Sequence, residues 1–147
     1  MSVPVPVWQF RHSVNCLAPR DFVWRYWTKV VNWDDPPASF QIDGPFAAGG
    51  KITTNLPGQT LLSVIRQVSE SREAIIDLQL PDAIFTFHWT LESLTDNQTR
   101  ITQHLELSGA AANSLVAQAS VLEQTTPDGM KRLVAAIERA HNQKTFT

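Results

Sequence analysis

Residues 73–94 read EAIIDLQLPDAIFTFHWTLESL, and this stretch predicts a β-hairpin. Apolar and polar side chains alternate on both sides of Pro81-Asp82, and a period of two is typical of a half-buried strand. A two-residue turn at this position sets two apolar pairs opposite each other, Leu78 with Phe85 and Ile76 with Phe87. Because the pairing and the alternation agree, we expect two neighbouring strands of an antiparallel sheet.

The same period of two continues on both sides of the hairpin. It predicts strands over residues 7–16, 39–43, 51–55, 61–68, 73–80, 83–94 and 99–109. The side of the sheet that residues 61–68 present is left open, because both of their alternating sets contain apolar residues. Two polar residues fall on otherwise apolar faces, His12 in the first strand and Gln103 in the last.

Helical spacing appears at two places outside this β-rich region. The segment Ala18-Pro19-Arg20-Asp21 starts a helix, since proline and an acidic residue both favour a first turn, and residues 32–37 end it. After Gly109, apolar side chains recur at helical spacing from Leu115 to His141. This stripe keeps its phase through Pro127, which predicts either one long helix kinked there or two coaxial helices with Thr126 capping the second.

Composition narrows the class of protein. A chain of 147 residues, 43% hydrophobic and 18% charged, predicts one globular domain over residues 1–147. The net charge of -2 offers no basic excess for nucleic acid. The single cysteine, Cys16, fits a reducing compartment, and neither a signal peptide nor a run of about 18 apolar residues is present. We therefore expect a cytoplasmic protein without a membrane span.

The order of these elements resembles the START-like (SRPBCC) superfamily, in particular its polyketide cyclase/dehydrase and lipid transport group. The resemblance rests on segments that span most of the chain. They are residues 12–24 with their alanine-proline helix start, Asn32-Trp33, Phe40 to Gly49, Phe87 to Trp89, 99–102, and 129–133.

The resemblance implies an α+β helix-grip fold. In this fold a curved antiparallel sheet of about six or seven strands wraps around a long C-terminal helix, with a short helical segment after the first strand. It also implies binding of a small hydrophobic or amphipathic molecule, such as a lipid, polyketide or isoprenoid, between sheet and helix. A cyclase or dehydratase without metal or nucleotide cofactor, and a chaperone-activating interaction module, are the alternatives. A homodimer is left open.

The candidate ligand-binding residues are the inward aromatics, the polar residues on apolar faces and one helix residue. Five tryptophans among 147 residues can line an apolar cavity as well as fill a core. The candidates are Trp24, Trp27, Trp33, Phe85, Phe87, Trp89, Gln103, His12 and Met130. Trp24 lies off the apolar rows of its helix, so we expect it at the cavity rim. His12 and Gln103 are also the weak candidates for moving protons in an enzyme, His12 as a general base.

Other chemistry-bearing residues favour structural interpretations. The four histidines have no metal-ligand spacing, so no metal site is predicted; His88 and His104 are expected as outward diagonal neighbours beside Glu92 and Glu106. Cys16 is expected as a buried thiol, and Asp34-Asp35 as a hydrogen-bonded turn. Arg66 would anchor an anionic ligand only if it pointed inward, which the sequence leaves open.

Overall fold

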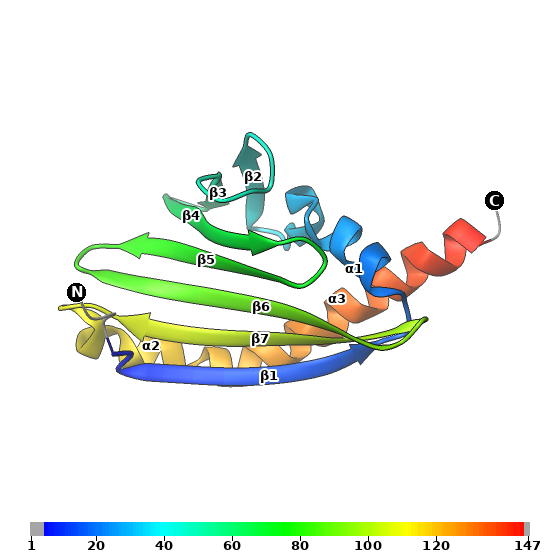
Figure 1. Cartoon of the computed structure of the whole chain (residues 1–147). Coiled ribbons are helices and arrows are strands. Elements are labelled where there is room, and N and C mark those ends of the chain that lie inside the picture. Colours follow the sequence, from blue (N-terminus) through cyan, green and yellow to red (C-terminus); the bar gives the residue numbers. More distant parts are fainter. Residues whose placement is uncertain (1–4, 146–147) are drawn as a thin grey trace.

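The computed structural model describes the backbone of residues 5–145 and the side chains of residues 5–143. Seven strands form one antiparallel sheet (Figure 1) in the spatial order β1-β7-β6-β5-β4-β3-β2. Their bounds are β1 Trp8–Cys16, β2 Ser39–Asp43, β3 Lys51–Leu56, β4 Gln59–Ser69, β5 Glu73–Leu80, β6 Ala83–Thr95 and β7 Gln98–Ser108. From β2 to β7 the sheet is a meander, and β1 then pairs with the last strand.

The helical segments are α1 Arg20–Trp27, the 3-10 helices η1 Val30–Trp33 and η2 Ala112–Leu115, α2 Val116–Ser120 and α3 Leu122–Thr145. Figure 1 shows α3 running along the sheet, with α1 beside its C-terminal half. The predicted helix-grip architecture is therefore confirmed. No helix in the described part of the chain is long and apolar enough to cross a membrane.

The hairpin predicted at Pro81-Asp82 is confirmed in its register. Leu78 lies opposite Phe85, and Ile76 lies opposite Phe87. The open question about β4 is answered by a register shift between Ile65 and Gln67, where the pairing with β5 skips one residue. Before this irregularity Ser63 and Ile65 are buried, whereas Leu62 is exposed.

The long helical stripe is interrupted earlier than the sequence predicts. The break lies at Val121, whose carbonyl oxygen accepts the first N–H groups of α3 from Gln124 and Thr125 at 3.1 and 3.2 Å. Of the two predicted alternatives, the cap at Thr126 is wrong, because one helix runs through both Thr126 and Pro127. Pro127 is also inside α3, where it removes one backbone hydrogen bond near the start of the helix.

Two groups of buried side chains form the core between the sheet and the helices. One gathers around α1 and the C-terminal half of α3 and includes Trp27, Ile76 and Ile137. The other lies at the opposite end of the sheet, near η2 and α2, and includes Trp8 and Leu107. Phe87 contacts both groups.

Candidate ligand-binding cavity

A cavity of about 720 Å³ lies between the sheet and α3. Its wall takes residues from both core groups, so the cavity separates them. Most of the wall is apolar. The lining residues are Trp27, Asn32, Trp33, Asp34, Asp35, Phe40, Ile52, Thr54, Leu61, Ser63, Ile76, Leu78, Phe87, Trp89, Gln103, Leu105, Leu122, Thr125, Thr126, Gly129, Met130, Arg132, Leu133 and Ala136.

Three tryptophans from α1, η1 and β6 form a continuous aromatic part of the wall. The ring of Trp27 lies 5.1 Å from that of Trp89 and 5.4 Å from that of Trp33, measured between centroids. Phe40 of β2 extends this group, with its ring 5.8 Å from Trp33. The rings meet at tilted or edge-on angles, which aromatic pairs prefer. This part of the wall therefore presents a continuous aromatic surface to the cavity.

Two buried polar side chains interrupt the apolar part of the wall. Gln103 of β7 is 8% exposed and Ser63 of β4 is 6% exposed. Gln103 lies between Trp89 and His12 in the register of the sheet. Its amide makes no side-chain hydrogen bond to any other residue of the described range 5–143. An amide offers two donors and an acceptor, all of which a bound molecule can use.

The charged residues of the wall stand together on the η1–β2 loop and on α3. The Arg132 guanidinium lies 3.5 Å from the Asp35 carboxylate, and both side chains are largely exposed. The Asp34 carboxylate accepts a hydrogen bond of 2.9 Å from the backbone N–H of Phe40. The predicted turn role of Asp34 is confirmed, and these charges mark the solvent side of the cavity.

The structure places the predicted residues in two groups. Trp27, Trp33, Phe87, Trp89, Gln103 and Met130 line the cavity, whereas Trp24, Phe85 and His12 do not. Trp24 is not at a rim, because it is 7% exposed and packs against Trp27 and Phe46. The binding role of the first group remains a prediction.

Phe85 and His12 face inward but lie away from the cavity. Phe85 is one row nearer the η2 end than Phe87, and its ring packs 5.8 Å from that of Trp8. His12 stands on β1, the edge strand that packs against α3, and its ring stacks on Phe10 at 6.5 Å. The expected use of His12 as a general base therefore lacks access to this cavity.

Ser63 is a buried polar wall residue that the sequence did not reveal. The irregularity in β4 hides its facing, since a single alternation over residues 61–68 is broken after Ile65. The alternation of β5 could have predicted that Ser63 faces inward, because antiparallel pairing sets Ser63 opposite the inward-facing Leu78.

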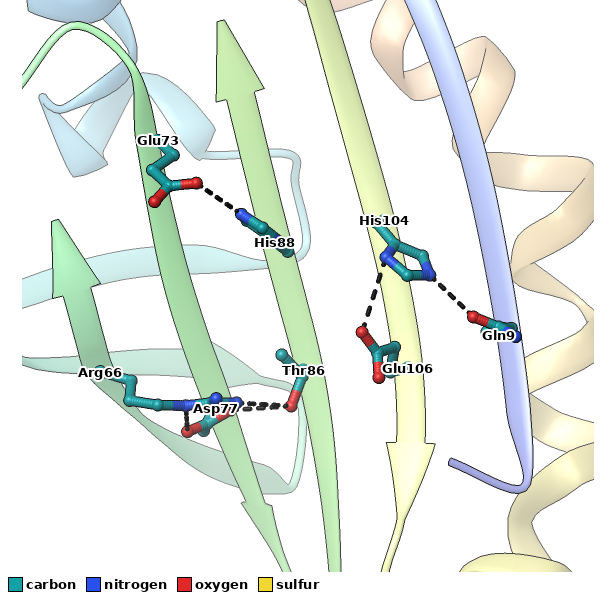
Figure 2. A network of polar contacts seen from close by, with 8 residues as sticks. All are labelled: Gln9, Arg66, Glu73, Asp77, Thr86, His88, His104 and Glu106. Atoms are coloured by element: carbon teal, nitrogen blue, oxygen red, sulfur yellow. Dashed lines mark hydrogen bonds and ion pairs between the residues drawn. The ribbon is translucent and has the colours of Figure 1, made fainter. Parts of the chain in front are cut away.

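The outer face of the sheet carries a separate polar network (Figure 2). The Arg66 guanidinium binds the Asp77 carboxylate, which also accepts a 2.7 Å hydrogen bond from the Thr86 hydroxyl. Burial favours a higher pKa for Asp77, but the hydrogen bonds from Arg66 and Thr86 together lower its pKa below the ordinary value. Arg66 therefore faces away from the cavity and is not a ligand anchor.

The outward histidines are direct rather than diagonal neighbours. His88 and His104 lie opposite each other in the pairing of β6 with β7. His88 lies 3.0 Å from the Glu73 carboxylate, and His104 lies 3.5 Å from Glu106 (Figure 2). Glu92, the other expected neighbour, instead pairs with an arginine on β7.

The outer network does not form a metal site. Among the residues that the structure describes, no three His, Cys, Asp or Glu side chains gather closely enough to hold a metal ion. The hydrogen-bonded pairs therefore give this face the solvated surface of a sheet with one buried side.

Comparisons with known proteins identify the fold. No family model and no curated protein sequence matches the chain. A norcoclaurine synthase from Thalictrum flavum superimposes with a TM-score of 0.72 at 11% identity, over 97% of this chain and 99% of its own. The Zhui aromatase/cyclase from Streptomyces sp. R1128 superimposes with a TM-score of 0.68 at 17% identity, over 89% of this chain and 93% of its own. Ara h 8.0201 superimposes with a TM-score of 0.63 at 16% identity, over 88% of this chain and 96% of its own. The chain thus has the same helix-grip fold as these proteins, and the fold predicted from its sequence is confirmed.

Proposed function

We propose that this protein binds a small hydrophobic or amphipathic molecule in the cavity between the sheet and α3. The cavity itself carries this proposal, because its 720 Å³ lies within the range of about 300–1,000 Å³ typical of small-molecule sites. Burial of apolar ligand surface contributes roughly 25 cal/mol per Å². The packed tryptophan rings of the wall provide the apolar surface against which the ligand is buried.

Proteins of the same fold support the proposal. A norcoclaurine synthase structure from Thalictrum flavum contains dopamine and hydroxybenzaldehyde, two small aromatic molecules, and superimposes on this chain with a TM-score of 0.69 at 10% identity. A second protein of the same fold is an aromatase/cyclase. These are arguments from fold, so the wall residues of this chain carry the greater weight.

Binding is favoured over the two alternatives. A cyclase or dehydratase needs a group that moves protons, but His12 lies off the wall and the Gln103 amide does not titrate. The carboxylates of the described wall already have partners, Asp34 the Phe40 N–H and Asp35 the Arg132 guanidinium. An interaction module of the chaperone-activating kind would be favoured by an exposed aromatic patch. The exposed large apolar residues of the described chain are aliphatic and scattered over several elements, among them Leu17, Val31 and Ile84.

The test is a titration with N-phenyl-1-naphthylamine, an uncharged dye whose emission rises in apolar surroundings. We expect saturable one-to-one binding, with quenching of tryptophan emission because Trp27, Trp33 and Trp89 lie on the wall. A protein that shows no saturable binding would overturn the proposal.

Gly129 of α3 offers a matched pair of variants. It lines the cavity, and a Cβ added there would meet only the Arg132 guanidinium, at 3.7 Å. Gly129→Phe should place a ring in the cavity and abolish saturable dye binding, whereas Gly129→Ala should retain it. Both changes remove a glycine from a helix interior, so neither should impair folding. Equal dye affinity in the two variants would show that the dye binds elsewhere.

A further inference from the structure

The charged residues of the cavity wall indicate which ligand charge the cavity can accept. Within the described part of the chain, its charged lining residues are Asp34, Asp35 and Arg132. Asp35 and Arg132 pair with each other and are 70% and 65% exposed, and the Asp34 carboxylate is occupied by the Phe40 N–H. The sheet side of the wall therefore has no charged side chain that could pair with an ionised group of a ligand. Burying an unpaired charge there would cost much free energy.

Gln103 provides the larger of the two buried, uncharged polar contacts in this apolar wall, the other being the Ser63 hydroxyl. It is 92% buried, as the complement of its 8% exposure, and its amide has no hydrogen-bond partner within residues 5–143. An amide donates to a carbonyl oxygen and accepts from a hydroxyl group, so both are matched here. Neither amide atom is among the fully buried unpaired atoms of the described chain, so the amide opens onto the cavity, where a ligand can hydrogen-bond to it.

The position of Gln103 also sets what lies next to that polar group. Gln103 pairs with Trp89 across β6 and β7, and directly paired side chains stand about 4.5–5.5 Å apart at Cβ. Trp27 packs against Trp89 on the other side. A ligand whose polar group meets the Gln103 amide therefore places its adjoining atoms against an indole ring, where a flat aromatic body packs best.

We propose that the cavity selects an uncharged molecule with a flat aromatic body and a hydroxyl or carbonyl group that hydrogen-bonds to Gln103. This inference rests on the proposed function and narrows it to a class of ligand. It disfavours fatty acids and other carboxylates whose ionised head lies against Gln103, because the cation of the described wall, Arg132, stands on the solvent side and pairs with Asp35.

Four probes that share one ring system test this selectivity: naphthalene, 2-naphthol, 2-acetylnaphthalene and 2-naphthoate. Each is measured at neutral pH by displacement of N-phenyl-1-naphthylamine from the wild-type protein. We expect 2-naphthol and 2-acetylnaphthalene to bind about tenfold more tightly than naphthalene, as one net hydrogen bond gives. We expect 2-naphthoate to bind more weakly than both. Binding of 2-naphthoate as tight as that of 2-naphthol would overturn the inference.

Gln103→Met tests the residue itself, because it keeps the length of the side chain and removes the amide. In this variant the tenfold advantage of 2-naphthol over naphthalene should disappear, while naphthalene itself binds as before. Gln79→Met is the control, since Gln79 is exposed on β5, and it should leave all four affinities unchanged. An advantage that persists in Gln103→Met overturns the assignment.

The two proposals fail in different ways. A protein that binds the dye but discriminates none of the four probes overturns the inference and leaves the proposed function standing. A protein that does not bind the dye overturns the proposed function. The ranking of the probes on the wild-type protein needs no variant, so the inference stays testable even if Gln103→Met does not fold.

Discussion

The Arg66 guanidinium on β4 donates two hydrogen bonds of 2.8 Å to the Asp77 carboxylate on β5. Thr86 on β6 donates a third, so three neighbouring strands are joined on the outer face. Asp77 is the more buried partner, with 15% of its side chain exposed against 51% for Arg66. The stabilising effect therefore depends on the charge of Asp77, whose pKa is lowered because these hydrogen bonds outweigh the effect of its burial.

We predict that Asp77→Asn lowers the free energy of unfolding at pH 7 by about 1–2 kcal/mol, as expected for charge-assisted hydrogen bonds with a half-exposed partner. The folded pKa lies below the ordinary value of 3.8, so the unfolded chain binds a proton first as pH falls. The contribution of the Asp77 charge to stability is therefore present above pH 3.8, and it is lost as the pH falls through the pKa of Asp77 in the folded protein. Urea unfolding over a pH series should show a shallower acid decline in the variant.

The exposed pair of Glu92 and Arg100 provides the comparison. Its side chains are 65% and 45% exposed, and a surface ion pair contributes about 0–1 kcal/mol. Glu92→Gln should therefore cost less at pH 7 than Asp77→Asn. Equal costs would contradict the special role assigned to Asp77.

Trp33 is predicted to matter for stability and binding together. Its indole Nε1–H donates a 2.7 Å hydrogen bond to the Trp27 carbonyl oxygen, and its ring lines the cavity. Trp33→Phe removes that bond, so we expect a loss of about 1 kcal/mol in the free energy of unfolding. Because the smaller ring also removes part of the apolar wall, the dye should bind several times more weakly in a fluorescence titration.

Trp24 separates the two effects. It is buried against Trp27 and Phe46 but does not line the cavity. Trp24→Phe should cost about 1–2 kcal/mol through lost packing. Its dye affinity should stay close to that of the wild type. A similar loss of affinity in both variants would show that the dye senses general stability and not the wall.

The fold follows from the sequence wherever alternation is unbroken. A two-residue turn and a period of two fix the register of β5 and β6, because a slip by one residue would move every apolar side chain to the solvent. Prediction stops at β4, where the register shift after Ile65 reverses the alternation. It also stops at Val121, since no proline, glycine or capping side chain marks that helix break.

The cavity is harder to predict than the sheet. Alternation tells which face a side chain occupies, but it does not tell which row along the strand lies over open space. Phe85 and Phe87 share a face, yet only Phe87 lines the cavity, because Trp8 covers the row of Phe85. His12 and Gln103 are also opposite each other, and only Gln103 is on the wall, because β1 packs against α3.

His104 gives a prediction of pH dependence on the outer face. Burial lowers the pKa of its imidazole below 6.5, and the nearby Arg11 and His88 add to this, while Glu106 acts in the opposite direction. The unfolded chain then binds this proton more readily than the folded one. The stability that comes from keeping the His104 ring neutral is present above pH 6.5, and it is lost as the pH falls through the pKa of His104 in the folded protein.

The measurement for His104 is an NMR titration of its ring in the native protein. The midpoint should lie below 6.5. His104→Gln should also flatten the change in the free energy of unfolding as pH falls from neutral through this range. A midpoint above 6.5 would mean that Glu106 dominates over burial, which would contradict the prediction.

Cys16, at the end of β1, is predicted to be inert until the protein unfolds. It is fully buried, and burial together with the nearby Glu138 carboxylate raises its pKa to about 12. Only the thiolate reacts, and an exposed cysteine has a pKa of about 8.5. At about pH 8 the folded protein should hold about a thousandfold less thiolate than the unfolded chain. Alkylation by iodoacetamide, followed by mass spectrometry, should therefore be very slow without urea and fast in urea.

Glu138→Gln distinguishes the two causes of this inertness. Burial is the larger effect, so the variant should react only slightly faster than the wild type. The Glu138 carboxylate also accepts the backbone N–H of Leu17 at 2.8 Å, which holds α3 against the chain that follows β1. Fast alkylation of the native variant, but not of the wild type, would show that this single contact keeps the end of β1 closed. Fast alkylation of both would contradict the burial of Cys16.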